Sequence, residues 1–360
     1  MSSGATMKTL LATLAGGASL SEAEAEAAFS LLMNGEATPA QMGGFLMALR
    51  LRGETVDEIT GAVRVMRAKV HPIEAPPGAI DTCGTGGDGH GTYNISTAAA
   101  LVTAACGVPV AKHGNRAISS RSGAADVLAA LGVNLECPMA QVHKALWEAG
   151  IAFLMAPRHH AAMRNVAGAR LELGFRTVFN LMGPLSNPAG AKRQLIGVFA
   201  DSWLEPMAHV LKRLGSEAAW IVHGSDGLDE ITTTGSTRYA RLENGEVVTG
   251  TLHPEQVGLD CARLEELKGG DAVTNAAALT ALLDGAGGPY RDIVLFNAAA
   301  ALMVAGKAVD LPAGMALARH ALDSGAARQT LARLVAITNA PISPLEPGSP
   351  SGSAANEASA

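Results

Sequence analysis

Residues 79–114, AIDTCGTGGDGHGTYNISTAAALVTAACGVPVAKHG, carry the clearest structural pattern in this chain of 360 residues. The apolar run AIDTC is followed by a glycine-rich stretch, an alanine-rich stretch and a second apolar run, VPVAKHG. Short apolar runs that alternate with helical stretches are typical of β-α-β units and a mostly parallel sheet. The same alternation predicts strands at VNLE, IAFLMA, QLIGVFA and AAWIVHG, and a hairpin at TRYARLENGEVVTG with its turn at Asn244 and Gly245.

The N-terminal part of the chain has a different, helical pattern. Capping boxes, in which a hydroxyl residue precedes a carboxylate or amide by three positions, mark helix starts. We predict a helical domain over residues 1–75, an α/β domain over residues 76–345 and a disordered tail over residues 346–360, which are rich in Pro, Ser and Ala. The capping boxes pair Ser21 with Glu24, Thr38 with Gln41, and Thr55 with Glu58.

Composition argues against several functional classes. The net charge of −6 disfavours a general nucleic-acid binder, because phosphate backbones are held by an excess of Lys and Arg. No apolar run approaches the roughly 20 residues of a membrane span, and the start, MSSGATMKTLLATLAGG, lacks the features of a signal peptide. The four cysteines form no C-x-x-C pair that would indicate a zinc site. We therefore expect a cytoplasmic protein that binds neither nucleic acid nor membranes.

The glycine-rich loop after AIDTC is a candidate anion site. Gly84, Gly86 and Gly89 match the dinucleotide pattern G-x-G-x-x-G, and the loop precedes a helix that we expect Ser96 or Thr97 to cap. A dinucleotide site also needs an acid about 20 residues further on, and this sequence has none there. The loop amides could still converge on a phosphate at the helix N-terminus. A tight structural connection is the alternative interpretation.

A basic segment, KHGNRAISSRSG, follows the second apolar run. It supplies Lys112, Arg116 and Arg121 together with small hydrogen-bond donors, which suits a ligand rich in phosphate. The triphosphate-binding pattern G-x-x-x-x-G-K-[ST] does not occur in the sequence. The glycine loop and this segment together favour a phosphorylated ligand more strongly than either does alone.

Two further polar groups follow predicted strands. Asp226, Asp229 and Glu230, in HGSDGLDEI, are either turn and helix-start residues or magnesium ligands beside a phosphate. The segment APRHHAAMRNVAGARLELGFRTVFNLMGPLSNPAG carries paired histidines and several arginines, which form either a solvated surface or a clamp for a carboxylate. The sequence leaves both choices open. The basic residues of this segment include His159, His160, Arg164, Arg170 and Arg176.

Four motifs in order resemble the anthranilate phosphoribosyltransferase family: GTGGDGHGTYNIST, KHGNRAISSRSGAADVLAALG, RLELGFRTVFNLMGPLSNPAG and DGLDE. They are spread over residues 81–230, and the helical N-terminus also fits the family's layout. The resemblance implies a helical domain, joined by helices from about residues 165–190, beside an α/β domain of the nucleoside phosphorylase/phosphoribosyltransferase type. It also implies homodimers and an active site at the hinge between the domains.

The family's reaction joins anthranilate to 5-phospho-α-D-ribose 1-diphosphate, the sugar donor, in tryptophan synthesis. It releases pyrophosphate and gives N-(5-phosphoribosyl)anthranilate. The resemblance assigns contacts with the sugar donor to residues of the glycine loop and of the basic segment. These residues are Gly84, Gly87, Asp88, Thr92, Asn94, Ile95, Ser96, Thr97, Lys112, His113, Gly114, Asn115, Arg116, Ala117, Ile118, Ser119, Ser120 and Ala124.

The resemblance also implies sites for the acceptor and for two magnesium ions per monomer. One departure from the family is visible, because Ala161 follows the paired histidines where the family commonly has Pro. The expected anthranilate contacts are Gly84, Asn115, His160 and Arg170. The expected magnesium ligands are Ser96, Asp229 and Glu230.

No residue is assigned as a catalytic acid or base. An aniline-type amine is neutral at pH 7, so it needs no strong base before it attacks. Stabilisation of the departing diphosphate would supply most of the rate. Two rival functions are a pyrimidine nucleoside phosphorylase and a non-catalytic relative that binds nucleic acid. The DGLDE and NISTAAA stretches fit the transferase better, and the acidic net charge argues against nucleic acid.

Overall fold

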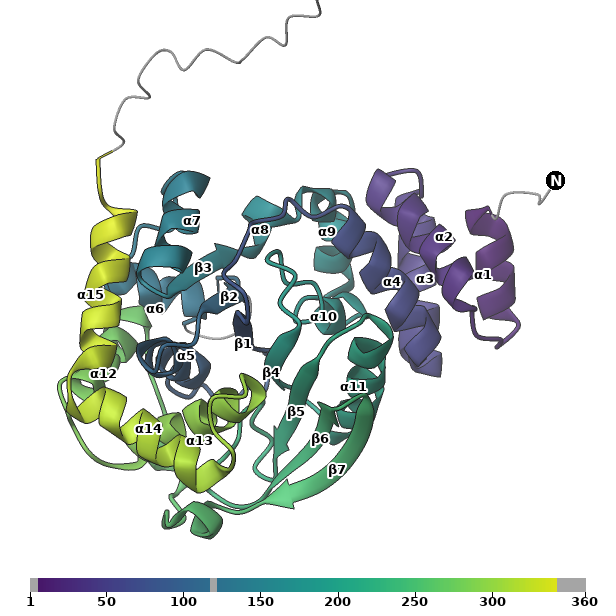
Figure 1. The fold of residues 1–360 in the computed structure, drawn as a ribbon. Helices are drawn as coiled ribbons and strands as arrows, with labels where there is room; N and C mark the ends of the chain where they lie inside the picture. Colours follow the sequence, from purple (N-terminus) through teal and green to yellow (C-terminus); the bar gives the residue numbers. More distant parts are fainter. Residues whose placement is uncertain (1–5, 117–121, 342–360) are drawn as a thin grey trace, which may run out of the picture.

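The computed structural model describes residues 6–116 and 122–341. A seven-stranded sheet runs through the described part in the order β3-β2-β1-β4-β5-β6-β7 (Figure 1). The first five strands in this order are parallel, whereas β6 and β7 are antiparallel, so the predicted mostly parallel sheet is confirmed. The strands are β1 (Ile80–Gly84), β2 (Val110–Gly114), β3 (Ile151–Met155), β4 (Arg193–Gly197), β5 (Ala218–Gly224), β6 (Thr237–Glu243) and β7 (Glu246–Leu252).

The strand predicted at VNLE is wrong, because none of residues 133–136 is in a strand and residues 135 and 136 form a turn. The polar groups of Asn134 have partners outside any sheet. Its side-chain oxygen accepts a hydrogen bond from the Glu136 N–H at 3.0 Å, and its own N–H donates to Thr338 Oγ1 at 3.2 Å. Local side-chain bonds of this kind compete with a strand ladder.

The hairpin predicted after β5 is confirmed. Asn244 and Gly245 connect β6 to β7 with φ angles of +51° and +78°. Positive φ angles at both central residues are typical of the type I′ turn, whose twist matches that of paired strands. The hairpin extends the sheet beyond β5.

The helices of the N-terminal region begin at the predicted caps. Ser21, Thr38 and Thr55 each accept a hydrogen bond from the amide three residues later, and Thr6 forms a further capping box that the sequence analysis missed. The helices are α1 (Met7–Ala15), α2 (Glu22–Asn34), α3 (Pro39–Arg52), α4 (Val56–Ala68), α5 (Ile95–Ala105), α6 (Ala124–Ala130), α7 (Met139–Glu148), α8 (Ala156–His159), α9 (Arg164–Leu173), α10 (Phe179–Met182), α11 (Leu204–Arg213), α12 (Ala272–Leu283), α13 (Pro289–Val304), α14 (Leu311–Asp323) and α15 (Ala326–Thr338).

The predicted cap of α5 is wrong. The helix begins earlier than a cap at Ser96 or Thr97 would allow, because the Asn94 carbonyl oxygen already accepts the hydrogen bond of Ala98 N–H at 3.1 Å. The Asn94 side chain makes no capping bond to the helix. The N-terminus of α5 therefore keeps amide groups that are free to meet residues from other loops.

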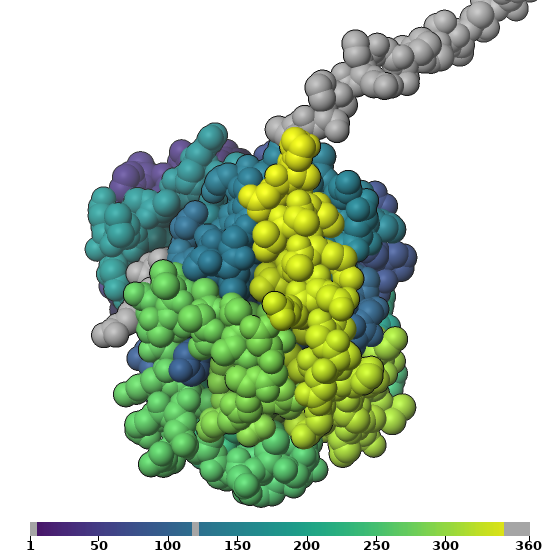
Figure 2. All heavy atoms as spheres, turned by 90° about the vertical axis from the view of Figure 1, so that its left-hand side faces the viewer, coloured from purple at the N-terminus to yellow at the C-terminus, as the bar shows by residue number. Residues whose placement is uncertain are grey.

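Helices cover both faces of the sheet and bury two apolar cores. One core joins α5, α13, α14 and α15 to one face, and the other joins α1 to α4 and α9 to α11 to the opposite face. Figure 2 shows α15, in yellow, along the surface beside α12, in green. The middle of the chain contributes to the N-terminal helical layer, because α9 contacts α2 and α3. Among the described helices, none is both long and apolar enough to cross a membrane.

Candidate active site

The carboxyl ends of the parallel strands bring the predicted site residues together. Gly84 ends β1, Gly114 ends β2, and His160 follows the short helix after β3. Asp229 and Glu230 lie in the loop after β5, which returns across the ends of β1 and β4. The strand order reverses between β1 and β4, and ligands of open α/β sheets bind at such a switch point.

Two strand-end glycines permit the close approach of the acidic loop. A Cβ atom on Gly197 would lie 1.5 Å from the Asp229 carbonyl oxygen. A Cβ atom on Gly84 would lie 2.5 Å from Asp229 Oδ2. A larger residue at either position would displace Asp229, so these glycines shape the site before any ligand arrives.

Asp229 and Glu230 are held by backbone amides rather than by cations. Asp229 Oδ2 accepts a hydrogen bond from the Gly86 N–H at 2.7 Å, and Glu230 Oε1 accepts one from the Ser96 N–H at 3.1 Å. Neither carboxylate pairs with a lysine or arginine within the described residues. Desolvation raises the pKa of Asp229 to about 7 and that of Glu230 to about 8. Two crowded carboxylates without a cation fit a divalent metal ion with oxygen ligands.

Asp226, the remaining acid of this loop, has a structural role. Its Oδ2 accepts hydrogen bonds from the hydroxyl groups of Thr232 and Thr234, both at 2.6 Å, and its Oδ1 accepts one from the Leu228 N–H at 3.1 Å. The carboxylate is therefore used within its own turn. The helix start considered for this segment is wrong, because the threonines close further turns instead, with the Thr234 N–H donating to Thr232 Oγ1 at 3.0 Å.

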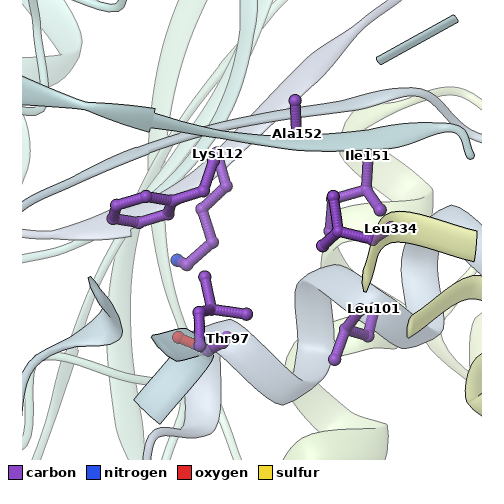
Figure 3. A pocket seen from close by; sticks show the side chains of 8 residues that line it. Thr97, Leu101, Lys112, Ile151, Ala152 and Leu334 are labelled. Carbon is purple, nitrogen blue, oxygen red and sulfur yellow. The ribbon is translucent and has the colours of Figure 1, made fainter. Parts of the chain in front are cut away.

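Lys112 is buried beneath the glycine loop, with 2% of its surface exposed. Its Nζ donates to the Thr82 carbonyl oxygen at 2.5 Å and to Ser96 Oγ at 3.3 Å. Burial lowers the pKa of Lys112 more than the nearby carboxylates raise it. Figure 3 shows its side chain extending from β2 toward Thr97, beside a cavity of about 10 Å³ that has room for about one water molecule. That cavity is too small for a substrate. Lys112 therefore contacts the candidate site through its hydrogen bond to Ser96 Oγ.

The rest of the glycine loop is tied to the segment around the start of α12. Thr92 pairs with this segment in an isolated bridge, and Asn94 Oδ1 accepts a hydrogen bond from Asn275 Nδ2 at 2.9 Å. Asp88 lies close enough to Asp229 to raise the pKa of that carboxyl. Loop and acids thus form one electrostatic unit, in which a cation would relieve the repulsion.

His113 and His160 form a buried pair, with exposures of 5% and 4%. Their Nε2 atoms lie 3.2 Å apart, so one nitrogen donates and the other accepts. Burial is the main cause that lowers the pKa of His113 to about 3 and that of His160 to about 4, and both rings are neutral at pH 7. Ala161, at the position of the family's Pro, begins the 3₁₀ turn Ala161–Met163, which directly follows this pair.

The segment after β2 is described only in part. Asn115 is exposed, and its side-chain oxygen accepts a hydrogen bond from the Arg116 N–H at 2.8 Å. Arg116 Nη1 lies 3.3 Å from Asp126 Oδ1, which directs this guanidinium toward α6, the helix that Ala124 begins. The predicted donor contacts Ala117, Ile118, Ser119 and Ser120 lie outside the described residues.

Arg170 and Arg176 each lie over an aromatic ring. The Arg170 Cζ atom is 5.2 Å from the centre of the Phe179 ring, and the Arg176 Cζ atom is 4.4 Å from that of Phe199. Neither guanidinium forms a hydrogen bond or ion pair with a residue that the structure describes. Partly buried arginines with free N–H groups favour an anion clamp over a solvated surface. Arg164, by contrast, is exposed at the start of α9.

Asp81 is a positioning residue that the sequence analysis missed. It is fully buried in β1, where its Oδ1 accepts a hydrogen bond from the His113 N–H at 3.1 Å. Its Oδ2 accepts one from Asn187 Nδ2 at 2.8 Å, and the same amide donates to the Ala111 carbonyl oxygen. Asp81 therefore joins β1, β2 and the turn at Asn187. Its position as an acid inside the apolar run AIDTC was the sequence feature that could have identified it.

The fold and the site define a two-part glycosyl transferase. A family model described as "Glycosyl transferase family, helical bundle domain" matches residues 8–70, and one described as "Glycosyl transferase family, a/b domain" matches residues 76–328. An anthranilate phosphoribosyltransferase from Azospirillum brasilense is 71% identical over 336 residues, which cover 93% of this chain and 94% of that protein. The chain therefore belongs to the anthranilate phosphoribosyltransferase family.

Solved structures agree with this assignment. The anthranilate phosphoribosyltransferase of Thermus thermophilus superposes with a TM-score of 0.87 at 48% identity, over 92% of this chain and 99% of that one. The Saccharomyces cerevisiae enzyme in complex with PRPP and Mg superposes with a TM-score of 0.84 at 27% identity, over 93% of this chain and 98% of that one. PRPP is the sugar donor considered above. Neither the phosphorylase nor the nucleic-acid-binding alternative is favoured by these matches.

Proposed function

We propose that this protein binds PRPP and magnesium at the carboxyl ends of β1, β2 and β5, with anthranilate beside them. As a member of its family it transfers the 5-phosphoribosyl group to the amine of anthranilate, in the biosynthesis of L-tryptophan. The observation that carries the site assignment is the pair Asp229 and Glu230. Their carboxylates meet the amides of Gly86 and Ser96 and lack a cation partner within the described residues.

We propose two magnesium ions per monomer, with Ser96, Asp229 and Glu230 as protein ligands. Bound magnesium would supply Lewis-acid stabilisation of the diphosphate that leaves from the anomeric carbon. The chain's own contribution is preorganised charge. The Gly86 and Ser96 amides are held by Asp229 and Glu230, so the remaining amides of the glycine loop and of the start of α5 would meet the anion, and Lys112 holds Ser96 Oγ at 3.3 Å. Fixed donors of this kind need no reorganisation when the charge develops.

The acceptor would be oriented by Arg170, Asn115 and His160. The Arg170 guanidinium, which lies over Phe179, has free N–H groups for the anthranilate carboxylate. The neutral His113–His160 pair can accept the proton that the amine loses after attack, although its lowered pKa values make it a poor base beforehand. Alignment of the amine behind the departing bond would therefore matter more than proton removal.

We also propose the division into a helical domain and an α/β domain at about residue 75, a cytoplasmic location and a homodimer formed through the helical domain. Large apolar side chains on the outside of the helical layer support the dimer. Met47 and Leu51 on α3 are 37% and 79% exposed, and Leu171 on the neighbouring α9 is 83% exposed. Apolar side chains gathered on one layer are typical of an interaction surface.

The function is tested by following the loss of anthranilate fluorescence on addition of PRPP and magnesium. Loss that requires both additions is expected, and thymidine with phosphate serves as the separate control. Phosphorolysis of thymidine without any change in anthranilate would assign the protein to the phosphorylases. Inactivity in both assays would favour a non-catalytic relative.

The acceptor clamp has its own test in Arg170→Ala. We expect the KM for anthranilate to rise by about tenfold to hundredfold, because a charged hydrogen bond is worth about 1.5–3 kcal/mol. The KM for PRPP should change far less. Equal increases for both substrates would remove Arg170 from the acceptor site.

A further inference from the structure

Arg176 occupies an unusual place between two elements of the site. The residue follows α9, and its guanidinium lies between the glycine loop and the aromatic ring of Phe199. The Cζ atom is 4.4 Å from the ring centre. A Cβ atom on Gly87 would lie only 2.6 Å from Nη2, 3.1 Å from Nε and 3.2 Å from Cζ, so the Nε–Nη2 edge of the group faces the glycine loop.

This contact requires glycine at position 87. Its φ of +75° lies in the region that favours glycine, and a side chain there would meet the guanidinium as well. Phe199 is tied to the same loop, because its N–H donates to Thr85 Oγ1 at 3.0 Å. The loop and the ring thus hold Arg176 between them, and a shorter side chain would leave a gap at this point.

The hydrogen-bonding capacity of Arg176 is unused. No hydrogen bond or ion pair joins its guanidinium to any residue in the described ranges, although the side chain is half-buried. Asp229 lies close enough for Arg176 to lower the pKa of that carboxyl. With its Nε–Nη2 edge toward the glycine loop, the group directs planar N–H donors to the side where a phosphate would lie, and this fork suits bidentate binding of oxyanions.

We propose that Arg176 is a further binding residue for the diphosphate group of the sugar donor and for the pyrophosphate product. This inference rests on the proposed function, since it extends the same site. Gly87 and Asp88 are among the residues to which the family resemblance assigns contacts with the sugar donor, so Arg176 lies on the donor side of the site, whereas Arg170 lies over Phe179 and would serve the carboxylate of the acceptor. The two arginines thus divide the two anionic groups of the reaction between them.

The test compares Arg176→Gln and Arg176→Lys with wild type and with Arg164→Gln, which alters an exposed arginine of the same region. Steady-state rates give the KM for each substrate, and product inhibition gives the constant for inorganic pyrophosphate at fixed magnesium. For Arg176→Gln we expect the KM for PRPP and the pyrophosphate inhibition constant to rise together by about tenfold to hundredfold. Arg176→Lys should restore only part of the loss, because it lacks the planar fork. Arg164→Gln should match wild type.

A second variant separates binding from loop support. Phe199→Leu removes the ring but keeps the guanidinium, so its pyrophosphate constant should change less than that of Arg176→Gln. Equal losses in Phe199→Leu and Arg176→Gln, or a rise confined to the anthranilate KM, would overturn the proposal. So would an unchanged pyrophosphate constant in Arg176→Gln. Absence of transfer by the wild type would instead contradict the proposed function.

Discussion

Two glutamates in different regions of the molecule differ in whether a cation pairs with their carboxylate. Glu58, in the helical layer, is fully buried and pairs with Arg52, while accepting the N–H groups of Leu20 and Thr55 at 2.9 Å each. Glu230, at the carboxyl edge of the sheet, is half-buried and accepts one amide, without an ion pair among the described residues. The first arrangement satisfies its charge within the protein. The second leaves charge for a ligand to satisfy.

The comparison predicts that substitutions at the sheet edge reduce activity and that substitutions at Glu58 reduce stability. In the double variant Asp229→Asn with Glu230→Gln, we expect the transfer rate to fall by about a hundredfold or more, since charge at the reacting centre is lost. The thermal midpoint should stay level or rise, because two desolvated carboxylates become neutral. Initial rates over a magnesium titration and an unfolding curve measure both effects. An unchanged metal requirement would exclude these residues from the metal site.

Glu58→Gln should give the reverse result. We expect the free energy of unfolding to fall by about 3 kcal/mol, because Arg52 loses its charged partner in a buried setting. Both KM values should stay near those of wild type. Glu22→Gln is the matched control, since Glu22 pairs with Arg64 at the surface and should cost less than about 1 kcal/mol. Chemical denaturation of the two variants tests the difference, and equal losses would contradict the contrast.

The buried pair His113 and His160 should make the free energy of unfolding fall as the pH is lowered. An unfolded histidine binds a proton near pH 6.5, whereas His160 in the fold binds one only near pH 4. Between these values the unfolded chain holds more protons, so the free energy of unfolding falls as pH falls. His160→Gln should remove about 2 kcal/mol of the loss between pH 6.5 and 4.5. Urea unfolding at several pH values measures this slope, and an equal slope in both proteins would count against the neutral buried ring.

Helix caps should give the smallest effect. Thr38→Ala removes the hydroxyl that accepts the Gln41 N–H at 3.3 Å, and we expect a loss of about 1 kcal/mol in unfolding free energy. Activity per folded molecule should not change, because α3 belongs to the helical layer. Thr38→Ser, which keeps the hydroxyl, is the control and should stay near wild type. A loss of activity in Thr38→Ala at unchanged stability would show that this layer acts directly on the site.

The elements that the sequence predicted correctly are those with local causes. Capping boxes at Ser21, Thr38 and Thr55, and the turn at Asn244 and Gly245, depend on groups within a few residues of one another. The two local errors have a different origin. The VNLE strand failed because residue 134 bonds to Thr338, which lies far along the chain. The cap predicted at Ser96 or Thr97 failed because Ser96 is already inside α5, where its N–H donates to Glu230 from a distant loop.

The sequence predicted which motifs form the site. It did not predict which residues of each motif face the site and which have a structural role. Asp226 and Asp229 stand three positions apart in one loop, yet one closes its own turn and the other meets the glycine loop. Neither composition nor spacing distinguishes them. Asp81 and Arg176 were likewise visible only as an acid in a strand and an arginine in a loop, since their partners come from distant segments.

The sequence was sufficient for the parallel sheet, the helical N-terminal region and the family, because apolar periodicity, caps and ordered motifs are properties of neighbouring residues. Tertiary structure was required to show which charges are satisfied. The Gly86 amide and the Asp229 carboxylate are 143 positions apart and meet at 2.7 Å. Such a contact arises when the strands fold side by side, and the desolvation that raises the pKa of Asp229 to about 7 arises with it.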